Sequence, residues 1–184
     1  MSKSKFAVIL VIGTEAVFFT LLILAYLYFR SIAKGSSNPE ALLDVIKTGI
    51  FSLFLFSSSF TVWRAEKNAV SFKFRRSALW LLITMIFGII FLTGQGIEWK
   101  FLIHHGETIS RNLFGTTFFT LTGFHGFHVL AGLIILGILL VLALTGNFKH
   151  SNTIGSVSAV ALYWHFVDAV WVIIFSIVYL GAKL

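Results

Sequence analysis

The chain has 184 residues; 58% are hydrophobic and 11% are charged, and the mean hydropathy is +0.95. This composition excludes an ordinary soluble globular domain and is typical of an integral membrane protein. Because cysteine is absent, the chain has no disulfide, no iron–sulfur cluster and no thiolate metal site. The net charge of +7 comes from basic residues scattered between apolar runs, which indicates contacts with lipid headgroups rather than a nucleic-acid surface.

Five apolar runs follow one another along the chain, and each has about the 20 residues that a helix needs to cross a bilayer. They comprise residues 6–29, 42–63, 77–99, 114–145 and 154–180. The sequence therefore predicts an all-α fold, an integral membrane bundle of five transmembrane helices in a single domain over residues 1–184. A signal peptide is the competing interpretation of the first run, but a shorter apolar region and a small-residue cleavage site would then be expected.

The segments between the runs are polar and predict the orientation in the membrane. Residues 31–40 form a linker with the only proline, residues 64–76 the most basic loop, residues 100–112 a polar loop and residues 146–153 a short turn. Lysine and arginine are more numerous on the side that holds the amino terminus, residues 64–76 and residues 146–153. This asymmetry predicts a cytoplasmic amino terminus and a carboxyl terminus outside.

Five ionisable residues are predicted near the middle of the bilayer. Glu15 lies within the first run, His125 and His128 within the fourth, and His165 and Asp168 within the fifth. Each pair spaced i, i+3 shares one helix face, and unpaired ionisable groups at this depth are costly. We therefore expect one shared layer of buried polar groups. Two interpretations stay open: a site that handles protons or contacts a partner, and hydrogen bonds that only hold the helices together.

A cofactor is a further interpretation of these histidines. His125 and His165 on two helices at one depth are compatible with haem ligation, and histidines at i, i+3 also occur in carboxylate-rich metal sites of helix bundles. However, a histidine pair occurs on only one predicted span, and the chain has no cysteine ligand. We expect no metal site, no other bound cofactor and no catalytic residue on this chain.

Small and polar residues predict close helix contacts. Small side chains let two helices approach each other in a membrane, and this role is expected for Gly115, Thr116, Gly123 and Gly126, and also for Gly94 and Gly96. Contacts at helix ends are expected for Gln95, Glu98 and Arg111, with Glu98 and Arg111 as a pair near the outer surface.

Four segments of the chain resemble subunit III of haem–copper oxidases, and most closely the short five-helix bacterial form of cytochrome c oxidase subunit III. They are TEAVFF at residues 14–19, GQGIEW at 94–99, GTTFFTLTGFHGFH at 115–128 and YWHFVDAVW at 163–171. The last two are long and specific. Together the segments cover the first, third, fourth and fifth predicted spans, in the order of the family.

The resemblance implies a non-catalytic subunit of a terminal oxidase in the bacterial plasma (inner) membrane. Family members pack on subunit I, which carries the haems and copper and couples oxygen reduction to proton pumping in aerobic electron transport. Subunit III stabilises the complex, supports proton uptake and holds phospholipids in a cleft between helix groups. Glu15 matches the family's buried, carbodiimide-reactive carboxylate. The long family form has seven spans, so one wall of the lipid cleft is missing here or is supplied by another subunit.

The implied partners are subunit I, other oxidase or supercomplex subunits, and phospholipids. Short relatives also accompany quinol oxidases and nitric oxide reductases, so an accessory subunit of either is an alternative. The residues alone leave two more: a stand-alone proton channel, motivated by the central acid and histidines, and a small membrane cytochrome that uses His125 and His165.

Overall fold

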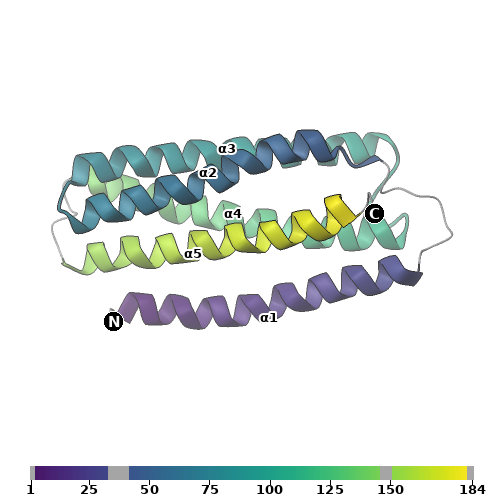
Figure 1. Ribbon diagram of the computed structural model, residues 1–184, viewed down its shortest axis with the longest axis horizontal. Helices are drawn as coiled ribbons and strands as arrows, with labels where there is room; N and C mark the ends of the chain where they lie inside the picture. Colours follow the sequence, from purple (N-terminus) through teal and green to yellow (C-terminus); the bar gives the residue numbers. More distant parts are fainter. Residues whose placement is uncertain (1–2, 33–41, 146–150, 182–184) are drawn as a thin grey trace.

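The computed structural model describes residues 3–32, 42–145 and 151–181, and within these ranges it contains five long α-helices and no strand (Figure 1). The helices are α1 (Lys3–Ile32), α2 (Val45–Val70), α3 (Phe74–His104), α4 (Leu113–Leu144) and α5 (Ser151–Phe175), and α5 continues into a π-helical turn, η3 (Ser176–Leu180). All five are long and apolar enough to cross a membrane. The predicted all-α architecture with five membrane spans is confirmed.

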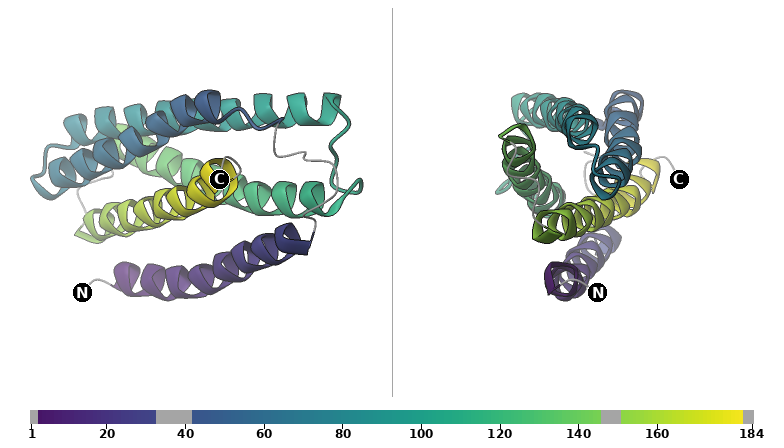
Figure 2. Two further views of the ribbon diagram at one scale, coloured as in Figure 1. Left: turned by 45° about the vertical axis from the view of Figure 1, so that its right-hand side comes forward. Right: turned by 90° about the vertical axis from the view of Figure 1, so that its left-hand side faces the viewer.

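Helices α2 to α5 form a four-helix bundle, and α1 packs on its outside. In the end-on view of Figure 2, α2, α3, α4 and α5 surround a common core, whereas α1 lies beyond α4 and α5. Only 6% of the most apolar window of α1 is buried, compared with 33–39% for the other four helices. Most of the surface of α1 is therefore left for lipid or for other polypeptides. The described ends of the chain lie at opposite ends of the bundle (Figure 1).

The loops of the structure are shorter than the sequence predicts, because charged residues at the edges of the predicted loops remain helical. Helix α2 continues to Val70 and α3 begins at Phe74, so most of the predicted basic loop at residues 64–76 is helix. The Lys67 ammonium lies 4.0 Å from the centre of the Trp63 ring. Hydropathy marks where apolar side chains end, whereas the backbone hydrogen bonds of a helix continue into the interface. For the same reason α3 extends to His104, beyond the predicted end at residue 99.

Side-chain caps define where two of the helices begin. An Asp44 carboxylate oxygen accepts a hydrogen bond from the Lys47 amide at 3.0 Å, so α2 begins at Val45 and not at residue 42 as predicted. Asn112 caps α4 in the same way, because its side-chain oxygen accepts from the Gly115 amide at 2.6 Å. Such caps satisfy amides that have no partner inside the helix.

A tryptophan of α5 joins all four helices of the bundle. The Trp164 side chain is fully buried, and its indole N–H donates to the Ser58 hydroxyl of α2 at 2.8 Å. Its ring lies against Gly88 of α3 and Gly132 of α4: a Cβ atom at these two positions would lie 3.0 and 2.8 Å from the indole. The two glycines thus form the space that the indole fills. This contact sets the rotation of α5 in the bundle.

Candidate functional site

The residues predicted at the membrane centre form two separate clusters instead of one layer. In the first cluster, Glu15 of α1 and His128 of α4 are in contact, with 3.0 Å between a carboxyl oxygen and Nε2 of the imidazole. The side chains are 27% and 12% exposed, respectively. This pair is one of the polar links between α1 and the four-helix bundle; near the other end of α1 the Arg30 guanidinium donates to the Gly181 carbonyl oxygen at 2.5 Å.

The hydrogen bonds of His128 determine how many protons the pair holds. Nδ1 lies 2.7 Å from the carbonyl oxygen of Phe124. Because a carbonyl oxygen only accepts, Nδ1 carries a hydrogen. One further proton then lies between Nε2 and Glu15, either as imidazolium with carboxylate or as imidazole with carboxylic acid. Both forms have zero net charge, which suits a low-dielectric membrane interior. Adding or removing one proton leaves a net charge there.

Aromatic side chains surround the pair and connect three helices. The rings of Phe18 and Phe124 meet edge to face at 5.0 Å between centroids, and Phe19 meets the His128 imidazole at the same distance. The Tyr163 hydroxyl of α5 donates to the His128 carbonyl oxygen at 3.1 Å. Helices α1, α4 and α5 therefore meet at this pair, and the aromatic rings cover part of it.

The second cluster lies between α2 and α5. The Ser59 hydroxyl donates to the Asp168 carboxyl group, and the Ser59 oxygen lies 3.0 Å from Nδ1 of His165. The Asp168 carboxyl group and Nδ1 of His165 therefore meet at one serine oxygen. The serine lies between the acid and the histidine, which differs from a hydrolytic triad, where the histidine is in the middle. The arrangement does not activate a nucleophile.

His125 contacts neither cluster through a hydrogen bond in the described part of the chain. It is 1% exposed, and its imidazole stacks on the Trp171 indole at 4.9 Å between centroids. The rings of Phe19 and Phe91 meet it edge to face. Neither ring nitrogen has a hydrogen-bond partner among the described residues. His125 therefore belongs to the aromatic core and is separate from the Glu15–His128 pair, although both histidines are on one helix.

A third polar cluster forms around Glu98 of α3. Its carboxyl oxygens accept hydrogen bonds from the Tyr179 hydroxyl at 2.5 Å, from the Thr48 hydroxyl at 2.9 Å and from the Gln95 amide at 3.4 Å. The expected pair between Glu98 and Arg111 is not formed among the described residues, because Glu98 is directed into the bundle. Nothing in the sequence marked Tyr179 or Thr48 as partners, since single tyrosines and threonines are common in apolar helices.

Arg111 belongs instead to the connection between α3 and α4. Its guanidinium donates to the Gly106 carbonyl oxygen at 2.7 Å and lies 4.0 Å from the buried carboxylate of Glu107. Glu107 also accepts a hydrogen bond from the Asn112 side chain at 2.7 Å. Gly106 has a φ of +82°, a left-handed conformation that favours glycine. These contacts shape the turn that leads into α4.

The small residues predicted for packing differ in their surroundings. A Cβ on Gly115 would overlap the Thr108 carbonyl oxygen, and one on Gly123 would lie 3.2 Å from the Trp99 ring. At Gly126 the nearest atom, in Leu92, would be 3.8 Å away, which is an ordinary contact. A Cβ on Gly94 would overlap the Phe51 ring, whereas one on Gly96 would have no neighbour within 4 Å. The Thr116 hydroxyl donates a hydrogen bond to the Ile109 carbonyl oxygen at 2.5 Å.

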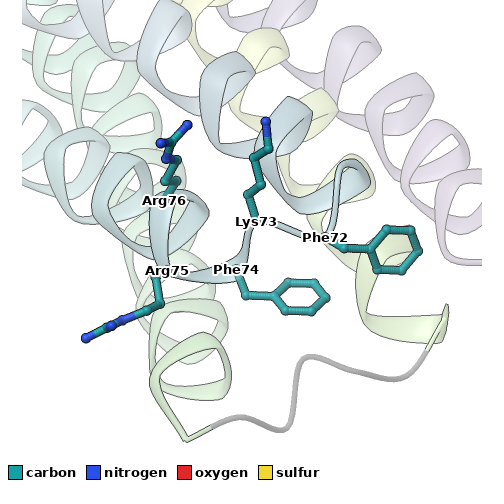
Figure 3. A pocket seen from close by; sticks show the side chains of 5 residues that line it. All are labelled: Phe72, Lys73, Phe74, Arg75 and Arg76. Carbon is teal, nitrogen blue, oxygen red and sulfur yellow. The ribbon is translucent and has the colours of Figure 1, made fainter.

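Basic side chains gather at the turn between α2 and α3. Figure 3 shows a surface depression lined by Phe72, Lys73, Phe74, Arg75 and Arg76. The Lys73 and Arg76 side chains extend to one side of the turn and Arg75 to the other, while the two phenylalanine rings project together. Cations around exposed aromatic rings are typical of the membrane interface, and the depression is too open for an enclosed substrate site.

The described residues contain no group of three or more histidine, aspartate or glutamate side chains arranged to hold a metal ion. Their ionisable groups inside the bundle are engaged in pairwise hydrogen bonds or packed among aromatic rings. Fold and site together define a multi-pass helical membrane protein in which an acid–histidine pair joins an outer helix to a four-helix bundle.

Comparisons with known proteins identify the family. The family model for cytochrome c oxidase subunit III matches residues 1–183. A probable cytochrome c oxidase subunit 3 of Mycobacterium leprae is 38% identical over 172 residues, which cover 91% of this chain and 83% of the relative. Cytochrome c oxidase subunit 3 of Synechocystis is 37% identical over 95% of this chain and 74% of the relative, and that of Bacillus subtilis 35% over 93% and 83%.

The chain belongs to the cytochrome c oxidase subunit III family. It is a multi-pass protein of a bacterial plasma membrane and a component of an oxidoreductase complex. The family expectation drawn from the four sequence segments is confirmed.

Proposed function

We propose that this chain is a non-catalytic subunit III that packs on the haem- and copper-bearing subunit I of a bacterial terminal oxidase, stabilises that subunit and supports proton uptake during oxygen reduction. The observation that carries the proposal is the contact between Glu15 and His128. This contact supports the proposal because it joins an acid to an imidazole with which it can share a proton, on a helix with little of its own surface buried in the bundle. The names of the relatives favour a cytochrome c oxidase over the quinol oxidase and nitric oxide reductase alternatives.

The pair supports proton uptake by holding one proton in a shared position. A carboxyl group and an imidazole 3.0 Å apart exchange that proton without a change of net charge. A proton that arrives nearby is taken up only at the cost of a positive charge in the bilayer, so the pair passes protons on and does not store them.

The proposed orientation has the amino terminus in the cytoplasm. The turn between α2 and α3 then faces the cytoplasmic leaflet, and Lys73, Arg75 and Arg76 contact anionic phospholipid headgroups. The haems and copper belong to subunit I, and we propose that this chain binds no metal or haem itself. Lipids that contact the bundle are its only proposed small-molecule ligands.

The test is purification of the chain from its native membrane under mild detergent. We expect a much larger haem-bearing polypeptide to be purified with it, and the visible spectrum of the complex to arise from that partner. Recovery of this polypeptide alone would contradict the proposal. A haem spectrum retained by the separated chain would support a small cytochrome, and proton flux in vesicles that contain only this chain would support a stand-alone channel.

The role of the pair is tested with Glu15→Gln in the assembled oxidase. A glutamine keeps a hydrogen-bond donor opposite Nε2 of His128 but does not exchange a proton. We expect normal assembly with slower proton uptake or a shorter catalytic lifetime. The matched control is Glu98→Gln, which changes a carboxyl group in a separate hydrogen-bond cluster. Unchanged pumping and lifetime in Glu15→Gln would mean that Glu15 only holds α1 in place.

A further inference from the structure

The end of α5 departs from α-helical geometry. Residues Ser176–Leu180 form the π-helical turn η3, and the Gly181 amide donates to the Ser176 carbonyl oxygen, five residues back. Turns of this kind are rare, occur mostly as single turns within longer helices, and are frequent at functional sites. Two side chains, those of Tyr179 and Arg30, connect this turn to other helices of the molecule.

The π turn places Tyr179 on a face of α5 that points into the bundle. Trp171 is fully buried on that face. In an unbroken α-helix Tyr179 would be rotated by about 80° from Trp171, because the eight positions that separate them make about two and a quarter turns. The i→i+5 bonds of a π turn place more residues in each turn, so Tyr179 returns toward the Trp171 face. The two rings lie 6.1 Å apart between centroids, and Tyr179 is fully buried.

The position of Tyr179 determines a hydrogen bond to an acid that is directed into the bundle. The Tyr179 hydroxyl donates to the Glu98 carboxyl group at 2.5 Å, which is shorter than the contacts of Glu98 with Thr48 at 2.9 Å and with Gln95 at 3.4 Å. Rotation of Tyr179 with its helix face would remove the closest of these three donors. The geometry of η3 therefore decides how Glu98 is hydrogen-bonded.

Arg30, near the end of α1, holds carbonyl oxygens of the same turn. Its guanidinium donates to the Gly181 carbonyl oxygen at 2.5 Å and lies 3.5 Å from that of Ile177. A cation beside the last carbonyl groups of a helix also interacts favourably with the helix dipole. A Cβ at position 181 would lie 2.9 Å from a guanidinium nitrogen, so glycine permits this approach. Arg30 thus contacts the chain on both sides of Tyr179.

These contacts connect α1 to an acid of a helix on the other side of the bundle. Figure 2 shows α4 and α5 between α1 and α3, the helix that carries Glu98. Only 6% of the most apolar window of α1 is buried, so few side chains attach this helix. Arg30 is one of them, and the turn that it holds carries the tyrosine donor of Glu98.

We propose that Arg30 is a positioning residue: from α1 it holds the π turn η3, and η3 keeps the Tyr179 hydroxyl on Glu98. When α1 and its guanidinium move away, η3 changes to α-helical geometry and Tyr179 rotates off the carboxyl group. The attachment of α1 is thereby transmitted to the interior of the bundle by a turn with two discrete arrangements. The device lies within this chain and does not depend on the proposed oxidase partner.

The test is fluorine NMR of the full chain in detergent micelles, with 3-fluorotyrosine at position 179 only. The resonance reports on the hydrogen bond of the hydroxyl group, and Glu98→Ala in the labelled chain gives the reference for a lost acceptor. We expect Arg30→Met to shift the resonance most of the way to this reference. The matched control is Arg111→Met, which removes another guanidinium that donates to a carbonyl oxygen, that of Gly106. The control should leave the resonance unchanged.

The same spectra separate positioning from mere attachment of α1. If Arg30 only fixed α1 to the bundle, the resonance would stay in place in Arg30→Met, and the proposal would be refuted. An equal shift in Arg111→Met would refute it as well. If Arg30→Met does not fold, Gly181→Ala takes its place, because the new methyl group displaces the guanidinium and leaves α1 unchanged. An unshifted resonance in that variant would then be decisive against the proposal.

A double-mutant cycle measures the coupling between Arg30 and the tyrosine hydroxyl. Tyr179→Phe removes the hydroxyl and keeps the ring. We expect Arg30→Met to change the unfolding equilibrium at least about twofold less in the Tyr179→Phe chain than in the unchanged chain, because the hydrogen bond that Arg30 maintains is already lost. Equal changes in the two chains would show that Arg30 acts independently of Tyr179 and would overturn the assignment.

Discussion

Substitution of Gly132 by alanine tests whether the Trp164 indole holds the bundle together. The added Cβ would lie 2.8 Å from two carbons of the indole and 3.3 Å from the Tyr163 ring. Trp164 has little freedom to move, because it is fully buried, is hydrogen-bonded to Ser58 and also packs against Gly88. The strain of the added methyl group therefore stays in the core.

The magnitude follows from two opposing terms. Overpacking of a core costs about 1–3 kcal/mol, whereas replacing glycine by alanine inside a helix gains about 1 kcal/mol. The matched control is Gly126→Ala on the same helix, where the new Cβ would be 3.8 Å from its nearest neighbour, so only the gain applies. We expect Gly126→Ala to be neutral or stabilising and Gly132→Ala to be less stable than this control by about 1–3 kcal/mol.

The assay is reversible unfolding of the purified chain in mixed micelles of a mild detergent and dodecyl sulfate, followed by tryptophan fluorescence and circular dichroism. A difference of 1.4 kcal/mol between the variants corresponds to about a tenfold change in the unfolding equilibrium. Equal free energies of unfolding for the two variants would show that the indole shifts without cost. The role given to Trp164 in setting the rotation of α5 would then be wrong.

Three further predictions concern the ends and the core of α2. The hydrogen bond from the Lys47 amide lowers the pKa of Asp44 below its ordinary value of 3.8. The cap therefore stabilises the folded chain above about pH 4, and this stabilisation is lost as the pH falls through the lowered pKa. Asp44→Ala should cost about 1 kcal/mol of unfolding free energy at pH 7, whereas Asp44→Asn should keep the cap and remove its dependence on pH. Ser52→Ala leaves the Trp171 indole N–H buried without its acceptor and should cost about 1–3 kcal/mol, while the same change at exposed Ser57 should be neutral in the same assay. Phe72 has a φ of 57°, so Phe72→Gly should raise thermal stability by relieving about 1 kcal/mol of strain; a lower melting temperature would show that the phenyl ring anchors the turn.

The number and order of the helices were predictable from the sequence, because each apolar run is long enough to cross a bilayer and few charges interrupt it. The helix ends were not. Arg64 and Lys67 looked like loop residues, yet both remain in α2, with Arg64 5.4 Å from the Trp80 ring centre and Lys67 on Trp63. A cation that rests on an interfacial ring satisfies its charge without ending the helix.

The polar residues of the site were predictable as a set but not as pairs. His125 and His128 are equivalent by spacing and depth, yet one is enclosed by aromatic rings and the other faces Glu15. The rotation of α4 about its axis decides this, and that rotation is set by packing partners on three other helices. Spacing within one helix carries no information about such contacts.

Some contacts had a weak signal in the sequence. Trp164 and Trp171 are seven residues apart on α5, and their acceptors Ser58 and Ser52 lie six apart on α2 in the opposite order. In two antiparallel helices, the residue number rises along one helix as it falls along the other. The contacts of Trp164 with Ser58 and of Trp171 with Ser52 follow this pattern. A serine-rich span opposite a tryptophan-bearing span therefore indicated how α2 and α5 pair. Ser59 could have been found from the same register.

The attachment of α1 has a consequence for synthesis at the ribosome. Glu15 and His128 are separated by 113 residues, and ribosomes add about 5–20 residues per second. The first helix thus enters the bilayer roughly 5–25 s before the imidazole that shares its proton has been translated. During that interval Glu15 lies in the hydrocarbon of the bilayer without its hydrogen-bond partner His128. An insertase or chaperone that shelters this segment would bring the early and late parts of the polypeptide together.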